Sequence, residues 1–163
     1  TQAGMAFSNA SVALVHGMSR PIGANFHVPH GLSNAMLLPA ITEFSVPAAE
    51  ARYGDCARQM GVVPAGTNDV TANRILLAEL KRLNEDLAVP SPADYGIDRE
   101  TYMDLLPLMA EQALDSGSPG NNPRVPTTDE IIELYQQVYS RVESTVLPPR
   151  VVQNTSQHRR ASR

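Results

Sequence analysis

The chain has 163 residues, of which 42% are hydrophobic and 18% charged, with a formal net charge of −4. This length suffices for one domain with a buried core, and the charge gives no reason to expect nucleic acid or a membrane surface as a partner. No apolar run approaches the roughly twenty residues of a membrane span. The single cysteine, Cys56, excludes an internal disulfide. We interpret it as a small buried hydrophobic residue and expect a reducing, cytoplasmic location.

Apolar residues recur with helical spacing along most of the chain, and no segment shows the alternation of a strand. Residues 5–18 predict a closely packed helix that Pro21 and Gly23 end, and residues 30–44 predict a second helix, kinked near Pro39. The first pattern begins at once and without an initiator methionine. We therefore expect a preceding part, with any targeting signal, to be missing.

Further helices are expected in the rest of the chain from their start signals and apolar stripes. One is predicted over 47–61, and the next runs from a cap at Thr67 or Asn68 through a leucine stripe to Leu87. Another is predicted over 99–117, with a cap at Asp98 and a division at Pro107. The last runs from a cap at Thr128 to Val142. The sequence therefore predicts an all-α domain over 1–143, followed by a disordered polar and basic tail over 144–163.

Three of the four histidines lie at the junction between the first two predicted helices. His16 is expected near the end of the first helix and His30 at the start of the second, so a turn between them would bring their side chains together. Imidazole is the commonest protein ligand for late first-row divalent metals, which makes the pair a candidate metal site. The alternative is that each histidine caps a helix end, and two imidazoles are fewer ligands than a firm site uses.

The run GMAFSNASVALVHGMSRPIGANFHVPHGLSNAMLLP resembles the signature of the iron-containing (group III) alcohol dehydrogenases, in which two histidines stand fourteen residues apart. A second segment, NNPRVPTTDEIIELY, resembles the family's asparagine-proline-arginine sequence before its last helix. Together the resemblance covers about residues 3–142. The signature positions filled in this chain are Ala6, Phe7, Asn9, Ala10, His16, Gly23, Pro29, His30, Gly31 and Ala35.

The resemblance implies the C-terminal, multi-helix domain of the dehydroquinate synthase-like fold of these enzymes, with the N-terminal Rossmann-like domain that binds NAD(P) missing. It also implies one Fe(II) or Zn ion, held by His16 and His30 together with an aspartate and a histidine from a D-x-x-x-H helix. That motif is absent here, because the residues four before the histidines are Val12, Gly23, Phe26 and Asn154. We therefore expect the other ligands in the missing domain, an inactive fragment, and a homo-oligomeric complete enzyme.

The same resemblance singles out further candidates for the site. Arg20 stands where many relatives carry a proton-relay histidine; arginine does not transfer protons near neutral pH but binds carboxylate or phosphate groups. His27 is either a replacement for that imidazole or a solvent-facing loop residue. Phe7 either lines the substrate pocket or packs in the core, and Ser118 either lies near a pocket wall or is an ordinary turn residue. For Asn34 we favour a bridge between helices over a contact that orients the histidines.

The expected activity is hydride transfer between a small alcohol and NAD(P), giving an aldehyde or ketone, with the metal as Lewis acid. The departure at Arg20 leaves open other enzymes of the superfamily: a hydroxyacid–oxoacid transhydrogenase, a maleylacetate reductase or a glycerol dehydrogenase. Two alternatives of another kind are a non-catalytic helical interaction module and a purely structural role for His16 and His30.

Overall fold

A computed structural model describes residues 2–140, apart from the side chains of Ala3 and Phe7. Over these residues the chain is helical without any strand, which confirms the predicted all-α class. The predicted tail over 144–163 lies outside the described residues. The elements are α1 (Gln2–Ala10), α2 (Leu14–Phe26), α3 (His30–Ser45), the 3₁₀ helix η1 (Val46–Ala48), α4 (Glu50–Gln59), α5 (Asp69–Asp86), α6 (Arg99–Asp104), α7 (Leu106–Asp115), the 3₁₀ helix η2 (Ser118–Asn121) and α8 (Thr128–Tyr139).

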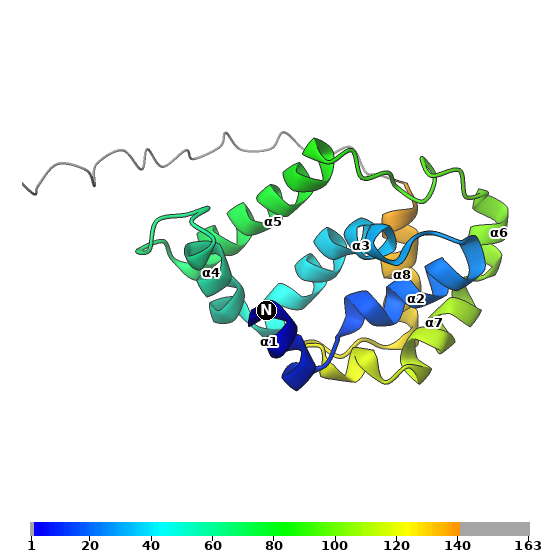
Figure 1. Ribbon diagram of the computed structural model, residues 1–163, viewed down its shortest axis with the longest axis horizontal. Coiled ribbons are helices and arrows are strands. Elements are labelled where there is room, and N and C mark those ends of the chain that lie inside the picture. The colour runs from blue at the N-terminus through cyan, green and yellow to red at the C-terminus, as the bar shows by residue number, and fades with distance from the viewer. Residues whose placement is uncertain (1, 141–163) are drawn as a thin grey trace, which may run out of the picture.

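Helix α3 connects two groups of helices (Figure 1). It packs against α2 and α8 in the larger group, which also contains α6 and α7, and against α5 in the smaller group, where α4 and α5 lie side by side. The larger group encloses the main core, whose fully enclosed members include Leu14, Met18, Ile22, Leu37, Tyr102, Met109, Ile131 and Tyr135. None of the helices in 2–140 combines the length and the apolar character that crossing a bilayer requires.

The first predicted helix, over 5–18, is wrong in both of its boundaries. The chain leaves the helix after Ala10, where Ser11 has a left-handed φ of 62°, and α2 then begins at Leu14. Asn121 donates a hydrogen bond to the Val12 carbonyl over 3.0 Å, so the break is stabilised by a distant loop and has no proline or glycine to mark it. Helix α2 then continues through Pro21 and Gly23, which were expected to end it.

Proline is tolerated within α3 because another helix satisfies the carbonyl that it frees. Pro39 has no N–H for the Ala35 carbonyl, four residues earlier in α3. The side-chain amide of Asn84, on α5, donates to that carbonyl over 2.7 Å. The predicted helix with an internal proline is therefore confirmed. The carbonyl that the proline leaves free forms a hydrogen bond that links α3 to α5.

Tyrosine hydroxyls tie the main core together. Tyr135 on α8 donates to the Met18 carbonyl of α2 over 2.7 Å, and Tyr102 on α6 donates to the Tyr135 carbonyl over 3.2 Å. Both rings are fully enclosed, and burial raises the pKa of both phenols, so they stay protonated donors. The two bonds thus link α6 to α8 and α8 to α2.

The start signals of the later helices mostly hold. Asn68 caps α5 and Asp98 caps α6, and the division at Pro107 is confirmed by the separate helices α6 and α7. Thr128 was predicted to cap the last helix, but the cap is Thr127, whose hydroxyl accepts from the Glu130 N–H in a capping box. On this helix Ile131, Tyr135 and Val138 are buried, and Val142, its predicted end, lies outside the described residues.

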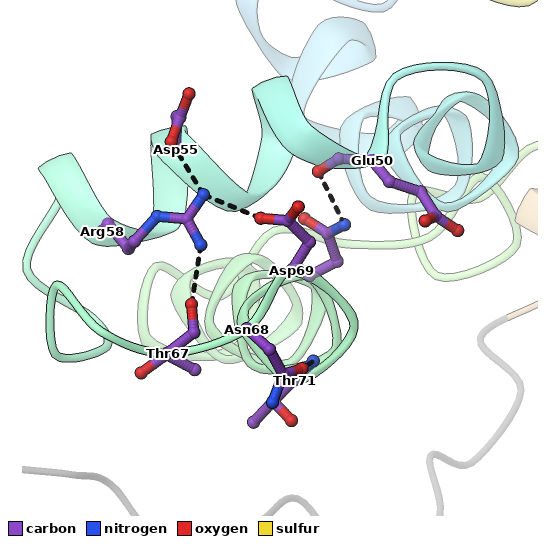
Figure 2. A network of polar contacts seen from close by, with 8 residues as sticks. Glu50, Asp55, Arg58, Thr67, Asn68, Asp69 and Thr71 are labelled. Atoms are coloured by element: carbon purple, nitrogen blue, oxygen red, sulfur yellow. Dashed lines mark hydrogen bonds and ion pairs between the residues drawn. The ribbon is translucent and has the colours of Figure 1, made fainter.

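The smaller group is held by a charged network between α4 and α5 (Figure 2). The Arg58 guanidinium donates to Asp55 over 2.7 Å, to Asp69 over 2.8 Å and to the Thr67 carbonyl over 2.7 Å. Gly54 makes room for this network, because a Cβ there would lie 2.5 Å from the Asp69 carboxylate. Beneath it is only a small core of Ala57, Val63, Ala72 and Leu76.

Two expectations about α4 and α5 need correction. Cys56, expected to be buried, is exposed on α4. The predicted leucine stripe is covered only where α4 lies over it: Leu76 is buried, whereas Leu83 is 49% and Leu87 66% exposed. Helix α5 has 18 residues and α4 has 10, so the stripe extends beyond its partner.

We predict that Asn84 and Pro39 are energetically coupled. Asn84→Leu should lower the free energy of unfolding by about 1–3 kcal/mol, because the Ala35 carbonyl loses its donor. In the Pro39→Ala background the same substitution should cost less, since residue 39 then supplies a backbone N–H to that carbonyl. Urea denaturation of the four proteins of this cycle measures the coupling, and strictly additive effects would contradict the assignment.

We predict that Gly54→Ala destabilises the protein, by about 1 kcal/mol, although alanine normally favours a helix over glycine. The reason is the displacement of the Asp69 carboxylate from Arg58. Gly4→Ala in α1, where nothing lies within 4 Å of the added Cβ, is the matched control and should be neutral or stabilising. Thermal melts followed by circular dichroism compare the two, and a Gly54→Ala protein as stable as the control would refute the clash.

Candidate metal centre

The structure brings two of the three junction histidines together. His16 lies in the first turn of α2, and His30 is the first residue of α3. Their ring centroids are 5.2 Å apart, with the ring planes tilted by 56°. His16 is half-buried and His30 is exposed, so the pair faces the surface of the described residues. The two imidazoles therefore lie close enough for a shared ligand, while their role as metal ligands stays a prediction.

The route by which the histidines meet differs from the one expected. His16 does not end a helix; it stands near the start of α2, and the chain passes the full length of that helix before turning. The turn folds back along α2, so that the Val28 carbonyl would lie 3.3 Å from a Cβ on Gly23. His27 makes this reversal as the cap of α2, with a left-handed φ of 56°. The close approach at Gly23 thus returns the chain toward His16.

A second close approach fixes α2 next to His16. A Cβ on Gly17 would lie 3.0 Å from the ring of Pro119, which η2 presses against this side of the helix. Pro119 is fully enclosed. Gly31, by contrast, has nothing within 4 Å of an added Cβ, so no close approach requires it within the described residues.

Electrostatics favour the neutral form of His16. Partial burial lowers the pKa of His16, and the neighbouring charges of His30 and Arg20 lower it further. A metal ligand must be the neutral imidazole, whose lone pair is free. The surroundings of His16 therefore keep it in the protonation state that a cation requires.

Asn34 contacts His30 one helical turn later, which sequence reasoning had not favoured. Its amide Nδ2 lies 3.1 Å from Nε2 of His30, within the same helix, so the expected bridge between helices is wrong. Its Oδ1 is fully enclosed without a hydrogen-bond partner in the part of the chain that the structure describes. Whichever amide atom faces the ring, the contact selects one tautomer of His30 and restrains its rotation. The signal in the sequence was the spacing of four residues from His30.

Arg20 and Ser118 are brought together although 98 residues separate them. Nη1 of Arg20 donates to Oγ of Ser118 over 3.4 Å. Ser118 is buried, with an exposed fraction of 5%, and its N–H donates to Oγ of Ser116. Arg20 follows His16 by one helical turn, and its charge is felt by that ring.

The other two candidates are not joined to this cluster. His27 is exposed, and its ring makes no hydrogen bond or ring contact within the described residues. Phe7 belongs to α1, but its side chain lies outside the described part of the structure.

The donor set fits a divalent transition metal in part. Two imidazoles, one of them favoured in its neutral form, are suitable ligands for iron or zinc. Among residues 2–140 no group of three or more His, Cys, Asp or Glu side chains comes together. The described residues thus present half of a typical ligand set.

Comparison with known proteins finds similarity over most of the chain. The model of the Fe-containing alcohol dehydrogenase family, C-terminal, matches residues 1–139. Lactaldehyde reductase of Escherichia coli K12 is 38% identical over 138 residues, covering 84% of this chain and 35% of the reductase. NADPH-dependent butanol dehydrogenase of Clostridium saccharobutylicum is 34% identical over 142 residues, covering 86% and 36%. The crystal structure of a 1,3-propanediol oxidoreductase is similar at a TM-score of 0.77 and 33% identity, covering 84% and 35%. The chain therefore spans about a third of the length of these relatives.

We predict that His16 of the metal-free chain titrates below the ordinary histidine value of about 6.5. Because the unfolded state then binds more protons, this group should reduce stability as the pH falls through about 6.5 toward the lower folded value. Replacing His30 by Ala should raise the pKa of His16 more than Arg20→Gln does, following the order of their effects. NMR titration of the imidazole resonances measures this, with Arg52→Gln on α4 as a charge-matched control.

Proposed function

This chain belongs to the iron-containing alcohol dehydrogenase family, and we propose that it is the metal-binding, C-terminal part of an NAD(P)-linked alcohol dehydrogenase. The observation that carries the proposal is the meeting of His16 and His30 at 5.2 Å, from two helices, in a chain whose whole helical region matches that family. The reaction interconverts a small alcohol with its aldehyde or ketone.

His16 and His30 would hold the metal, Fe(II) or Zn. When bound, the metal supplies Lewis acidity to the hydroxyl oxygen of the alcohol, and NAD(P) accepts the hydride. Around them, Asn34 contacts the His30 ring, and the close approach of the Val28 carbonyl to Gly23 shapes the turn between the two helices that carry the histidines. Positioned ligands lower the cost of binding a cation because the protein has little left to reorganise.

The remaining parts of the active site are proposed to come from outside the described residues. By resemblance, an aspartate and a histidine of a D-x-x-x-H helix would complete the ligand set, and a dinucleotide-binding domain would hold NAD(P). Within this chain, exposed His27 is the candidate to pass the hydroxyl proton to solvent, since imidazole exchanges protons near neutral pH. Phe7 and Ser118 are the candidates to line the substrate site.

The same proposal extends to the location and the assembly of the complete enzyme. A cytoplasmic location suits an enzyme that draws on NAD(P) and a chain with a single, exposed cysteine. We also propose a homo-oligomer. The smaller helix group leaves Leu83 and Leu87 uncovered within the described residues, which is consistent with a further contact there.

We predict that His16→Ala and His30→Ala in the complete enzyme each lower metal affinity by more than about 100-fold, since loss of even an indirect partner of a ligand costs 10–100-fold. Metal content measured by mass spectrometry, alongside circular dichroism to verify folding, tests this. His27→Ala is the matched control and should retain its metal. Unchanged metal content in the double variant would assign His16 and His30 a purely structural role.

A further inference from the structure

Arg20 is a positioned cation without a counter-ion. Within the described residues it makes no ion pair, whereas Arg58, Arg82 and Arg124 each pair with a carboxylate. Arg20 instead donates to the neutral hydroxyl of Ser118. An exposed arginine without a partner is common, but this guanidinium is tethered to a buried residue.

Ser118, which accepts the hydrogen bond from Arg20, is itself held by its neighbours. Ser118 opens η2, its own N–H is bound by Ser116, and the following residue, Pro119, is enclosed against Gly17 of α2. Arg20 is therefore held between α2 and η2. Its guanidinium has five N–H donors, of which Ser118 takes one. The rest remain available to an anion.

The place where Arg20 is held lies beside the candidate metal centre. It follows His16 by four residues on α2, which puts the two residues on one face of the helix. We propose, on the basis of the function proposed above, that Arg20 binds the carboxylate of the substrate, so that the enzyme acts on short hydroxy acids.

The chemistry of the two ends then divides between two groups of this chain. The hydroxyl end lies at His16 and His30, and the carboxylate end accepts paired hydrogen bonds from the planar guanidinium. The balanced reaction is hydroxy acid plus NAD(P)⁺ giving the oxo acid or semialdehyde, NAD(P)H and a proton. The carboxylate is unchanged, so Arg20 determines specificity and orientation and takes no part in proton transfer.

A phosphate of the cofactor is the other anion that a guanidinium can bind. Cofactor phosphates are usually held at the start of a helix, where free backbone N–H groups point at them. Arg20 lies in the middle of α2, where backbone N–H groups are used within the helix, and no free N–H groups accompany it. The surroundings therefore favour a carboxylate from the substrate.

The test compares kcat/KM of the complete enzyme for two matched pairs, 4-hydroxybutanoate with butan-1-ol and 3-hydroxypropanoate with propan-1-ol. We expect the wild type to prefer the acids. Arg20→Gln should lower the acid-to-alcohol ratio of kcat/KM by roughly 10- to 100-fold, mainly through KM, because a charged hydrogen-bonding partner is lost. Arg20→Lys should keep part of the preference, and Ser118→Ala should lose a smaller part. The control Arg52→Gln, an equal charge change on α4, should match the wild type.

Each other outcome overturns the inference in a recognisable way. If Arg20→Gln weakens NAD(P)H binding, measured by nucleotide fluorescence, and leaves the ratio unchanged, the anion is a cofactor phosphate. An equal loss for acids and alcohols would make Arg20 a structural support of His16. A wild type that oxidises alcohols without preferring acids leaves the proposed function standing and removes this inference. Absence of metal-dependent turnover with all four substrates would remove the proposed function as well.

Discussion

The close contact of the chain with helix α2 at two glycines is the constraint on which the rest of the structure depends. Gly17 lies under the ring of Pro119, and Gly23 lies under the carbonyl of Val28. The first contact fixes the loop that carries Ser118, and the second returns the chain so that His30 reaches His16. A side chain at either position would push one of these segments away. The candidate site therefore depends on the close approach of Pro119 and Val28 to α2.

Polar contacts between distant residues compensate for the irregularities that this arrangement introduces. Asn84 donates to the carbonyl that Pro39 frees in α3, and Asn121 donates to the Val12 carbonyl in the break before α2. Asn122 links the same loop to Ser45, at the end of α3, over 2.9 Å. Such buried polar links contribute modestly to stability but strongly to the choice of one arrangement, because an unmatched alternative leaves polar groups without partners.

The sequence predicted those features that depend on local chemistry. Apolar periodicity gave the helical class, and caps such as Asn68 and Asp98 gave the starts of helices. The prediction of local structure failed where distant residues decide the conformation. Ser11 carries no turn signal, and its left-handed conformation is stabilised through Asn121; Pro21 stays within α2 because other helices pack against that segment. Thr127 and Thr128 are both suitable caps, and the choice depends on which one Glu130 reaches.

The candidate site was predictable to the same extent. The pairing of His16 with His30 could be inferred from a family signature, yet the physical reason first given for it, a turn between two helix ends, was wrong. Asn34 was visible by its spacing from His30, but only the structure shows its amide against the ring. The contact between Arg20 and Ser118 spans 98 residues and had no signal in either segment alone.

The two proposed ligands come from one helical hairpin, which has consequences for how a metal would be bound. Contacts within residues 2–140 position this hairpin: Val28 lies close to Gly23 in the turn, and the amide of Asn34 contacts the His30 ring. For the metal site proposed above, ligands that are already ordered would lose less conformational freedom on binding. Partial burial, and after it the neighbouring His30 and Arg20, lower the pKa of His16 and favour its neutral form. The neutral ring of His16 presents a lone pair suited to a cation, and Arg20, which makes no ion pair within the described residues, presents N–H donors suited to an anion. The substrate proposed above, with an alcohol oxygen and a carboxylate, matches this pairing of a lone pair with a guanidinium.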